Sequence, residues 1–207
     1  PDPPETEPHM DKLFDGYRRF RDEVWPAERD RYEALSKGQS PHTLVVACSD
    51  SRVDPQTIFG AAPGELFVVR NVAALVPPYE PDAGYHGTSA ALEFGVRVLK
   101  VAKVAHAQCG GVRAMVEGAP PEARDFVPKW MEIAEAVLWP DGAPNEPEAH
   151  LCHFETEVVA LTLRNLMTYP WIRQRVEDGD LTLHGLRFDI HTGVLSRATE
   201  AGLVPVS

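Results

Sequence analysis

Three reactive side chains lie at alternate positions early in the chain: the thiol of Cys48, the carboxylate of Asp50 and the guanidinium of Arg52. The apolar run at residues 44–47 that precedes them predicts a buried strand. If the chain stays extended beyond this strand, its period of two places all three side chains on one side. They would then lie at the carboxyl edge of the sheet, where open α/β sheets bind their ligands.

A second cluster of potential metal ligands lies far away in the sequence. His106 and Cys109 are three residues apart, close enough to bind one ion together, and Cys48 would complete a set of two thiolates and one imidazole. Three such protein ligands with a fourth position open to water are typical of catalytic zinc sites, whereas structural zinc sites have four protein ligands. We therefore expect one Zn²⁺ per subunit, bound by Cys48, His106 and Cys109.

The residues around these ligands predict how the open position is controlled. Two thiolates cancel the charge of Zn²⁺ and weaken its Lewis acidity. Asp50 would help by accepting a hydrogen bond from hydroxide at the open position, and Arg52 would hold Asp50 in a bidentate pair. Without Arg52, Asp50 could swing onto the metal as a fourth ligand and close the site. The backbone N–H of Gly110, at an expected helix start, could orient an anionic product.

Each of these features also has a simpler interpretation. A lone cysteine at a strand end is most often a small buried hydrophobic residue, and a lone His-x-x-Cys pair is weak evidence for a metal. The combination of both with a carboxylate and a guanidinium at fixed offsets favours the metal site. Cys152 and His153 stand at the start of an amphipathic segment, so we interpret them as structural. Arg70 and Asn71 could line the site or pack at a subunit contact.

Composition and charge narrow the class of protein. The chain has 207 residues, a hydrophobic content of 43% and a charged content of 25%, as expected for one globular domain. Its net charge of −11 argues against binding to nucleic acid or to an anionic membrane surface. No apolar run approaches the roughly 18 residues that span a bilayer, and residues 1–9 lack the pattern of a secretion signal. We expect a cytoplasmic protein without disulfides, since its three cysteines are few and odd in number.

Strands that alternate with helices along the chain predict an α/β fold, with a mostly parallel central β-sheet flanked by helices. Residues 66–70 are expected to be a fully buried strand, residues 71–85 an ordered loop, and Thr88 the cap of the helix that follows. A terminal hairpin is expected to turn at residues 191–193. The expected strands are residues 42–47, 66–70, 101–105, 181–184, 188–190 and 194–195. The expected helices are residues 56–59, 88–99, 112–117, 126–138, 153–167 and 171–176.

Two N-terminal segments precede the sheet. Residues 1–9 are rich in proline and acidic residues and are expected to form a disordered or loose arm. Residues 10–36 carry apolar and aromatic residues at helical spacing, with a break forced by Pro26. This helical arm would pack on a partner subunit or cover the chain's own sheet. Residues 10–207, the helical arm included, are expected to form a single catalytic domain.

Three motifs together resemble those of one enzyme family. They are CSDSRVDP at residues 48–55, PGELFVVRNVA at residues 63–73 and HAQCGGV at residues 106–112, and they are similar to the motifs of the β-class carbonic anhydrases. The resemblance covers nearly all of the chain beyond the first ten residues. It implies zinc-dependent, reversible hydration of CO₂ to bicarbonate and a proton. It also implies a homodimer or larger homo-oligomer, with the active site at the subunit interface and N-terminal helices that embrace the neighbouring subunit.

Within this family the sequence looks closer to the plant-like branch. Gln39 matches a glutamine that this branch takes from the neighbouring subunit to bind a substrate oxygen, and Phe67 and Val72 match its apolar substrate pocket. Phe94 stands where plant enzymes have a tyrosine, so the resemblance implies a pocket with one hydroxyl fewer. Val45 stands where the bicarbonate-inhibited bacterial branch has a tryptophan, and so no allosteric bicarbonate site is expected.

The segment before His106 departs from the family pattern. Residues 99–106 are about three residues shorter than the apolar strand that family members have there, which corresponds to about 10 Å of strand. Either the helix at residues 88–99 ends early and yields residues to the strand, or the strand is displaced, or the sequence is incomplete. Two alternatives to CO₂ hydration also stay open. One is hydrolysis of a CO₂ analogue such as carbon disulfide or carbonyl sulfide, which relatives perform, and the other is a catalytically silent zinc-binding scaffold, which the short strand would explain.

Overall fold

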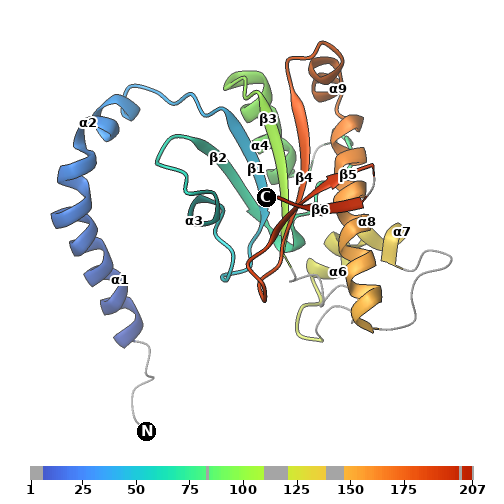
Figure 1. The fold of residues 1–207 in the computed structure, drawn as a ribbon, viewed down its shortest axis with the longest axis horizontal. Coiled ribbons are helices and arrows are strands. Elements are labelled where there is room, and N and C mark those ends of the chain that lie inside the picture. Colours follow the sequence, from blue (N-terminus) through green and yellow to red (C-terminus); the bar gives the residue numbers. More distant parts are fainter. Residues whose placement is uncertain (1–6, 83, 110–120, 139–146, 201, 207) are drawn as a thin grey trace, which may run out of the picture. The chain divides into compact units, whose positions relative to one another are not determined.

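The computed structural model describes residues 7–82, 84–109, 121–138, 147–200 and 202–206 (Figure 1). The chain divides into two compact units, Pro1–Gln39 and Ser40–Ser207. The first unit is a helical arm, and the second carries the sheet and the candidate site. Within the described residues, no helix combines the length and the apolar character needed to cross a membrane.

The N-terminal unit is helical as far as Leu35. Helix α1 (Glu7–Arg19) continues through a π-helical turn, η1 (Phe20–Val24), into helix α2 (Trp25–Leu35). The helix begins at Glu7, inside the segment that was expected to be a loose arm, and residues 1–6 lie outside the described part. Four large side chains of α1 are about half exposed or more, namely Met10, Leu13, Phe14 and Tyr17.

Pro26 does not break this helix, contrary to expectation. In a regular α-helix its ring would collide with the carbonyl group four residues earlier. The π-helical turn directly before it widens the helix, with the N–H of Trp25 donating to the carbonyl oxygen of Phe20. Pro26 thus takes a position at the start of α2 where no N–H is needed. The rings of Phe20, Trp25 and Tyr32 pack together around the turn, with the closest centroids 4.8 Å apart.

The second unit is built on a six-stranded sheet with the strand order β2-β1-β3-β4-β5-β6 (Figure 1). Strands β1 to β4 run parallel, whereas β5 and β6 are antiparallel additions at one edge. The mostly parallel sheet expected from the sequence is confirmed. The strands are β1 (Thr43–Cys48), β2 (Leu66–Asn71), β3 (Lys103–Cys109), β4 (Thr182–Phe188), β5 (Leu195–Thr199) and β6 (Gly202–Pro205).

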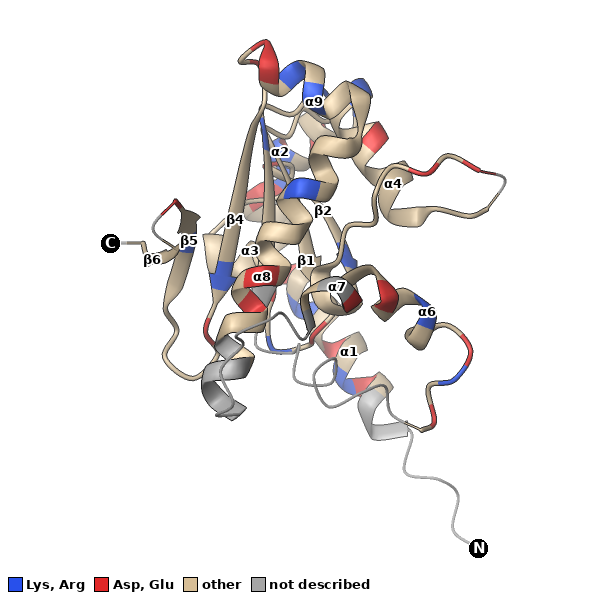
Figure 2. Ribbon diagram, turned by 90° about the vertical axis from the view of Figure 1, so that its right-hand side faces the viewer, with Lys and Arg blue, Asp and Glu red and all other residues tan. Residues whose placement is uncertain are grey.

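Helices cover the two faces of the sheet unequally. Helix α3 (Pro55–Phe59) packs on one face, next to β1. The other face is covered by α4 (Gly87–Glu93), the π-helical turn η3 (Phe94–Val98), α8 (Pro147–Thr168) and α9 (Pro170–Glu177) (Figure 2). Two glycines let the backbone approach closely on this second face. A Cβ atom on Gly95 of η3 would lie 2.4 Å from Leu44, and one on Gly185 of β4 would lie 2.4 Å from Val159 of α8.

The main core lies between the sheet and these helices. It contains buried aliphatic side chains from β1, β3, α4, η3 and α8, together with Tyr169 and Ile172, and burial of this apolar surface stabilises the fold. A second core forms where Phe154 and Val158 of α8 pack against Leu75 and a set of short helices. These are α6 (Val127–Met131), η5 (Glu132–Ala134) and α7 (Glu135–Leu138). The helical segment expected at residues 126–138 is therefore confirmed from Val127 to Leu138, with a 3-10 turn in its middle.

Three further expectations about the elements need correction. Strand β2 is the edge strand of the sheet, so its residues are only partly buried rather than fully buried. Residues 182–188 form one strand, which pairs with β5 across the predicted turn, and β6 was not expected. Thr88 does not cap α4, because the helix begins one residue earlier, at Gly87; its buried hydroxyl accepts a hydrogen bond from Asn71 of β2 instead. The helix expected at residues 112–117 lies outside the described residues.

Strand β3 shows where the short segment before His106 is accommodated. The preceding helical segment ends at Val98, and Lys100 adopts a left-handed conformation with φ of 55° as the chain turns back. Strand β3 then begins level with β1, because Lys103 pairs with Thr43. The start of the strand is therefore not displaced.

His106 lies inside the sheet. It is the fourth residue of β3 and pairs with Val46 of β1 and with Gly185 of β4. The strand was expected to end before His106, but it continues to Cys109. His106 therefore does not follow the strand, as the sequence predicted, but is part of it.

Candidate functional site

Cys48 is the last residue of β1, and its side chain points to the face of the sheet that α4, η3, α8 and α9 cover. Its side chain lies on the same side as Leu44 and Val46, because side chains alternate along a strand, and only 6% of the residue is exposed. Asn71 of β2 lies beside it in the sheet. The N–H of Ser49 donates to the carbonyl oxygen of Asn71, and the chain leaves the sheet directly after this bond.

Asp50 and Arg52 form a bidentate ion pair in the turn after β1. Arg52 donates from Nε to Oδ1 of Asp50 at 2.9 Å and from Nη2 to Oδ2 at 2.6 Å. The backbone N–H of Arg52 also donates to Oδ1 at 2.9 Å, and the N–H of Val53 donates to the Asp50 carbonyl oxygen. These local bonds bend the chain, so the expected extension of the strand through Asp50 and Arg52 is wrong. The side chain of Asp50 is only 13% exposed and that of Arg52 is 61% exposed.

Arg70 binds the backbone of the same turn from the neighbouring strand β2. Its Nε donates to the carbonyl oxygen of Cys48 at 2.9 Å. Its Nη2 donates to the carbonyl oxygens of Asp50 and Val53, both at 2.7 Å. One guanidinium therefore connects the carbonyl group at the end of β1 with two carbonyl groups of the turn that follows.

The turn ends at Asp54, which caps helix α3. The carboxylate of Asp54 accepts hydrogen bonds from the hydroxyl and the N–H of Thr57, at 2.7 and 2.9 Å. These two bonds, and to a smaller extent the charge of Arg70, hold the pKa of Asp54 below its ordinary value against a small effect of burial. The cap is therefore ionised at neutral pH and fixes the start of α3.

His106 is fully buried in β3. Both of its ring nitrogens are buried and make no hydrogen bond within the described residues. Burial lowers the pKa of His106 to about 4; the backbone of Ala74 works in the opposite direction but forms no hydrogen bond of ordinary geometry with the ring. The imidazole is neutral at physiological pH, which is the form that binds metal ions. A buried polar group without a partner costs about 1–3 kcal/mol, and a ligand at the ring would remove this penalty.

Cys48 and His106 face the same side of the sheet. His106 pairs with Val46, whose side chain points the same way as that of Cys48 two residues further along β1. With about 3.3 Å per residue and about 4.8 Å between strands, the two Cα atoms are about 8 Å apart. Both side chains can reach one ion across this separation. A thiol and a neutral imidazole with unpartnered nitrogens fit a metal ion that prefers sulfur and nitrogen ligands, as zinc does.

Cys109 is the last residue of β3 and pairs with Phe188 of β4. The side chain of Cys109 and the whole of Gly110 lie outside the described residues. Among the side chains that the structure describes, no three from His, Cys, Asp and Glu are grouped to hold a metal ion. Cys109 as a third ligand and Gly110 as a product-binding residue stay predictions.

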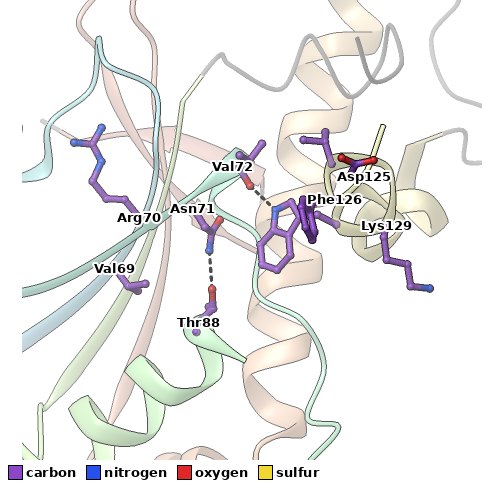
Figure 3. A pocket seen from close by; sticks show the side chains of 11 residues that line it. Val69, Arg70, Asn71, Val72, Thr88, Asp125, Phe126 and Lys129 are labelled. Atoms are coloured by element: carbon purple, nitrogen blue, oxygen red, sulfur yellow. Dashed lines mark hydrogen bonds between the residues drawn. The ribbon is translucent and has the colours of Figure 1, made fainter. Parts of the chain in front are cut away.

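A cavity of about 780 Å³ lies beside this edge of the sheet, with walls from the end of β2, the start of α4 and helix α6 (Figure 3). Val72, which follows β2, lines it together with Phe126 and Trp130. The Nε1 of Trp130 donates to the carbonyl oxygen of Val72 at 2.8 Å, and Asn71 donates to Thr88 at 3.1 Å (Figure 3). The lining is mainly apolar, which suits an uncharged substrate.

The other predicted substrate-binding residues are distributed over several elements. Phe67 of β2 and Phe94 of η3 stack on each other with ring centroids 5.9 Å apart, outside the lining of the cavity. Gln39 is the last residue of the N-terminal unit, so its role stays a prediction. Trp130 was not singled out from the sequence, and its contact with Val72 joins residues 58 positions apart. No local sequence pattern signals a contact over such a separation.

Comparison with known proteins identifies the family. A family model described as carbonic anhydrase matches residues 43–195. A carbonic anhydrase of Pseudomonas aeruginosa is 36% identical over 189 residues, which cover 89% of this chain and 85% of that protein. The solved structure of the β-carbonic anhydrase CcaA has a TM-score of 0.87 and 31% identity, and the match covers 96% of this chain and all of that one. The chain belongs to the β-class carbonic anhydrases.

The chain is also similar to a plant protein. A chloroplast β-carbonic anhydrase of Arabidopsis thaliana is 36% identical over 183 residues, which cover 85% of this chain and 60% of that protein. The predicted family, the α/β fold and the assignment as an enzyme, a carbonic anhydrase, are confirmed. The plant-like branch and the cytoplasmic location stay predictions, and so do the roles of the individual site residues.

Proposed function

We propose that this β-carbonic anhydrase catalyses the zinc-dependent, reversible hydration of CO₂ to bicarbonate and a proton. The observation that supports zinc is the buried imidazole of His106. Its ring nitrogens make no hydrogen bond within the described residues, and the side chain faces the same side of the sheet as the Cys48 thiol. Cys48, His106 and Cys109 would hold the ion. The chemistry that zinc supplies in such a site is Lewis acidity, which makes water a nucleophile near neutral pH.

Asp50 would orient the nucleophile. Its Oδ1 accepts from the Nε and the backbone N–H of Arg52, and its Oδ2 accepts from Nη2 of the same residue. In this proposal the carboxylate accepts the hydrogen bond of the nucleophile. The bidentate pair with Arg52 would hold the carboxylate in this orientation, so that it does not turn onto the metal. In the same proposal, loss of Arg52 lets Asp50 act as a fourth ligand and close the site.

The apolar end of β2 would receive CO₂. Val72 is 49% exposed and lines the cavity beside the metal site. A cavity of about 780 Å³ is much larger than CO₂, and a second subunit is expected to narrow it. Exposed apolar side chains support a homodimer or larger homo-oligomer, namely Phe94 and Val98 on η3 and those of α1. In this assembly Gln39 of the neighbouring subunit would bind a substrate oxygen.

Stopped-flow CO₂ hydration, with zinc quantified in the same sample, tests the proposal. Cys48→Ser is expected to lose zinc and to reduce hydration to the background rate. Cys152→Ser is the matched control, because Cys152 lies on α8 and is interpreted as structural; it should keep both zinc and activity. Full-rate hydration by metal-free protein would refute the proposal. Bound zinc without turnover would indicate the silent scaffold, and faster turnover of carbonyl sulfide than of CO₂ would indicate the hydrolase.

A further inference from the structure

The turn that carries Asp50 and Arg52 depends on a residue outside it. The N–H of Ser49 makes a backbone bond to β2, and Asp54 caps the next helix. Between them, the N–H of Val53 donates to the Asp50 carbonyl oxygen and the N–H of Arg52 donates to the Asp50 carboxylate, so these two bonds lie within the turn. The side-chain pair of Asp50 and Arg52 fixes the carboxylate, but Arg52 is itself 61% exposed. The local bonds therefore set the shape of the turn and leave its position relative to the sheet to other contacts.

Arg70 supplies those contacts from a strand of the sheet. Arg70 is the fifth residue of β2 and pairs with Ala47, one residue before Cys48. It therefore lies on the face opposite to the thiol, where its side chain crosses the end of β1 to reach three carbonyl oxygens. A guanidinium holds its donors in a fixed plane, so bonds to three acceptors also fix the acceptors relative to one another.

Two of the three carbonyl groups belong to residues of the proposed site. One is that of Cys48, the proposed metal ligand, and another is that of Asp50, the residue proposed to orient the nucleophile. The third, that of Val53, lies on the far side of the turn. A shift of the guanidinium would move the thiol and the carboxylate relative to each other. The exposed fraction of the Arg70 side chain is 33%, so most of the side chain is shielded from solvent by the groups around it.

We propose that Arg70 is a positioning residue that sets the distance between the Cys48 thiol and the Asp50 carboxylate by binding three backbone carbonyl groups of the turn. Arg70 also lines the cavity assigned to CO₂, but in this proposal it acts through the backbone of the turn and not by contact with substrate or metal. The inference rests on the proposed function for its effect on catalysis. The placement of the turn itself is independent of that function and can be measured in metal-free protein.

Arg70→Lys tests this proposal, since lysine keeps the charge but cannot bind three separated carbonyl groups in one plane. The matched control is Arg175→Lys, because Arg175 also donates to two backbone carbonyl groups, those of Val96 at 2.9 Å and Asp180 at 3.1 Å, far from the turn. Both variants are examined without metal by hydrogen exchange of the peptide covering residues 49–54. Alkylation of Cys48, followed by peptide mass spectrometry, is measured in parallel.

Arg70→Lys is expected to speed exchange at residues 49–54 and alkylation of Cys48 by about tenfold, the factor for one lost hydrogen bond to a charged group. Arg175→Lys should change neither. In the zinc-loaded enzyme, kcat of Arg70→Lys should fall by about 10–100-fold with zinc content retained, because a misplacement of about 1 Å can have that effect. The visible spectrum of the Co²⁺-substituted variant should also change.

Equal exchange and alkylation rates in Arg70→Lys and Arg175→Lys would overturn the proposal, whatever the activity. If Arg70→Lys does not fold by circular dichroism, Arg70→Gln, which keeps one N–H donor of similar reach, takes its place with the same expectations. A wild-type protein that binds no zinc or hydrates no CO₂ would refute the proposed function. The exchange and alkylation readouts would still decide the role of Arg70.

Discussion

The two halves of the candidate metal site are held in opposite ways. On the β1 side, Asp50 has both carboxylate oxygens bonded to Arg52, and the backbone of its turn is bonded to Arg70. On the β3 side, His106 is fully buried and both ring nitrogens make no hydrogen bond within the described residues. Hydrogen bonds within the protein preorganise the first half. In the second half, the ring nitrogens of His106 make no such bonds among the described residues and can bind a ligand.

This difference indicates where the free energy of the proposed metal binding would go. A metal ion at His106 would remove the penalty of a buried polar group, so binding and stability would be coupled strongly there. At Asp50 the local bonds exist already, and a metal ion would add little to the stability of the turn. Metal removal should therefore loosen the surroundings of His106 more than the turn at residues 49–54.

The largest expected effect comes from His106→Leu. This variant should lose zinc and all CO₂ hydration above background. Metal-free His106→Leu should nevertheless be more stable than the metal-free wild type by about 1–3 kcal/mol, because an unsatisfied buried polar group is replaced by an apolar one. Urea unfolding in the presence of a chelator measures this difference.

The control for His106→Leu is His184→Leu. His184 lies on the opposite face of the sheet and interacts with Thr182 Oγ1 at 3.0 Å. This variant should keep zinc and gain no stability. A metal-free His106→Leu that is less stable than the wild type would show that the ring nitrogens have partners, and the contrast between the two halves would disappear.

Arg52→Ala tests the preorganised half and should have the next largest effect. The variant is expected to keep zinc but to lose about 10²-fold in kcat, because Asp50 can then turn away from its orienting position. Arg97→Ala is the matched control, since Arg97 forms an exposed pair with Glu93 at 2.7 Å on the helical segment α4–η3. Metal analysis and stopped-flow CO₂ hydration assays are carried out on both variants. Unchanged activity in Arg52→Ala would refute the proposal that Arg52 keeps Asp50 from closing the site.

Gly185→Ala acts on the packing behind His106 and should have a moderate effect. Gly185 pairs with His106, and a Cβ atom there would lie 2.4 Å from Val159 of α8. Overpacking of this kind costs about 1–3 kcal/mol, which thermal unfolding can measure. Gly87→Ala is the control, because a Cβ atom on Gly87 meets nothing within 4 Å. Equal melting temperatures for the two variants would show that α8 yields easily.

Asp54→Ala should have the smallest effect, and one that depends on pH. The pKa of Asp54 is lowered in the folded state, first by the Thr57 hydroxyl and then by the Thr57 N–H. A lowered pKa stabilises the fold above the unfolded value of about 3.9, and this contribution is lost as the pH falls through the folded value. The side chain is 48% exposed, so we expect a loss of about 1 kcal/mol at pH 7 and a smaller one below pH 3. A loss that is the same at both pH values in urea unfolding would contradict this.

Much of the fold could be predicted because it depends on local patterns. The apolar runs at β1 and β2 and the motifs around Cys48 and His106 are read directly from adjacent residues. The pairing of Asp50 with Arg52 was also predicted, but it arises from a turn rather than from an extended strand. Such a turn depends on backbone bonds to the Asp50 carboxylate that alternation along the chain does not indicate.

The features that could not be predicted depend on contacts between distant segments. Thr88 has the sequence pattern of a helix cap, yet its hydroxyl is used by Asn71, 17 residues away. The π-helical turn η3 brings Gly95 against Leu44, and nothing in residues 88–99 alone distinguishes it from an α-helix. The depth of His106 in the sheet follows from the register of β3 with β1, which only the paired strands define.

The position of β2 has a consequence for handling the protein. Among the described strands, β2 pairs only with β1, and its sequence Leu66–Asn71 is rich in residues that favour strands. An edge strand of this composition is a template on which another chain can add a strand. During refolding from denaturant we therefore expect the yield to fall as protein concentration rises. Light scattering over a dilution series would measure how strongly assembly and aggregation compete.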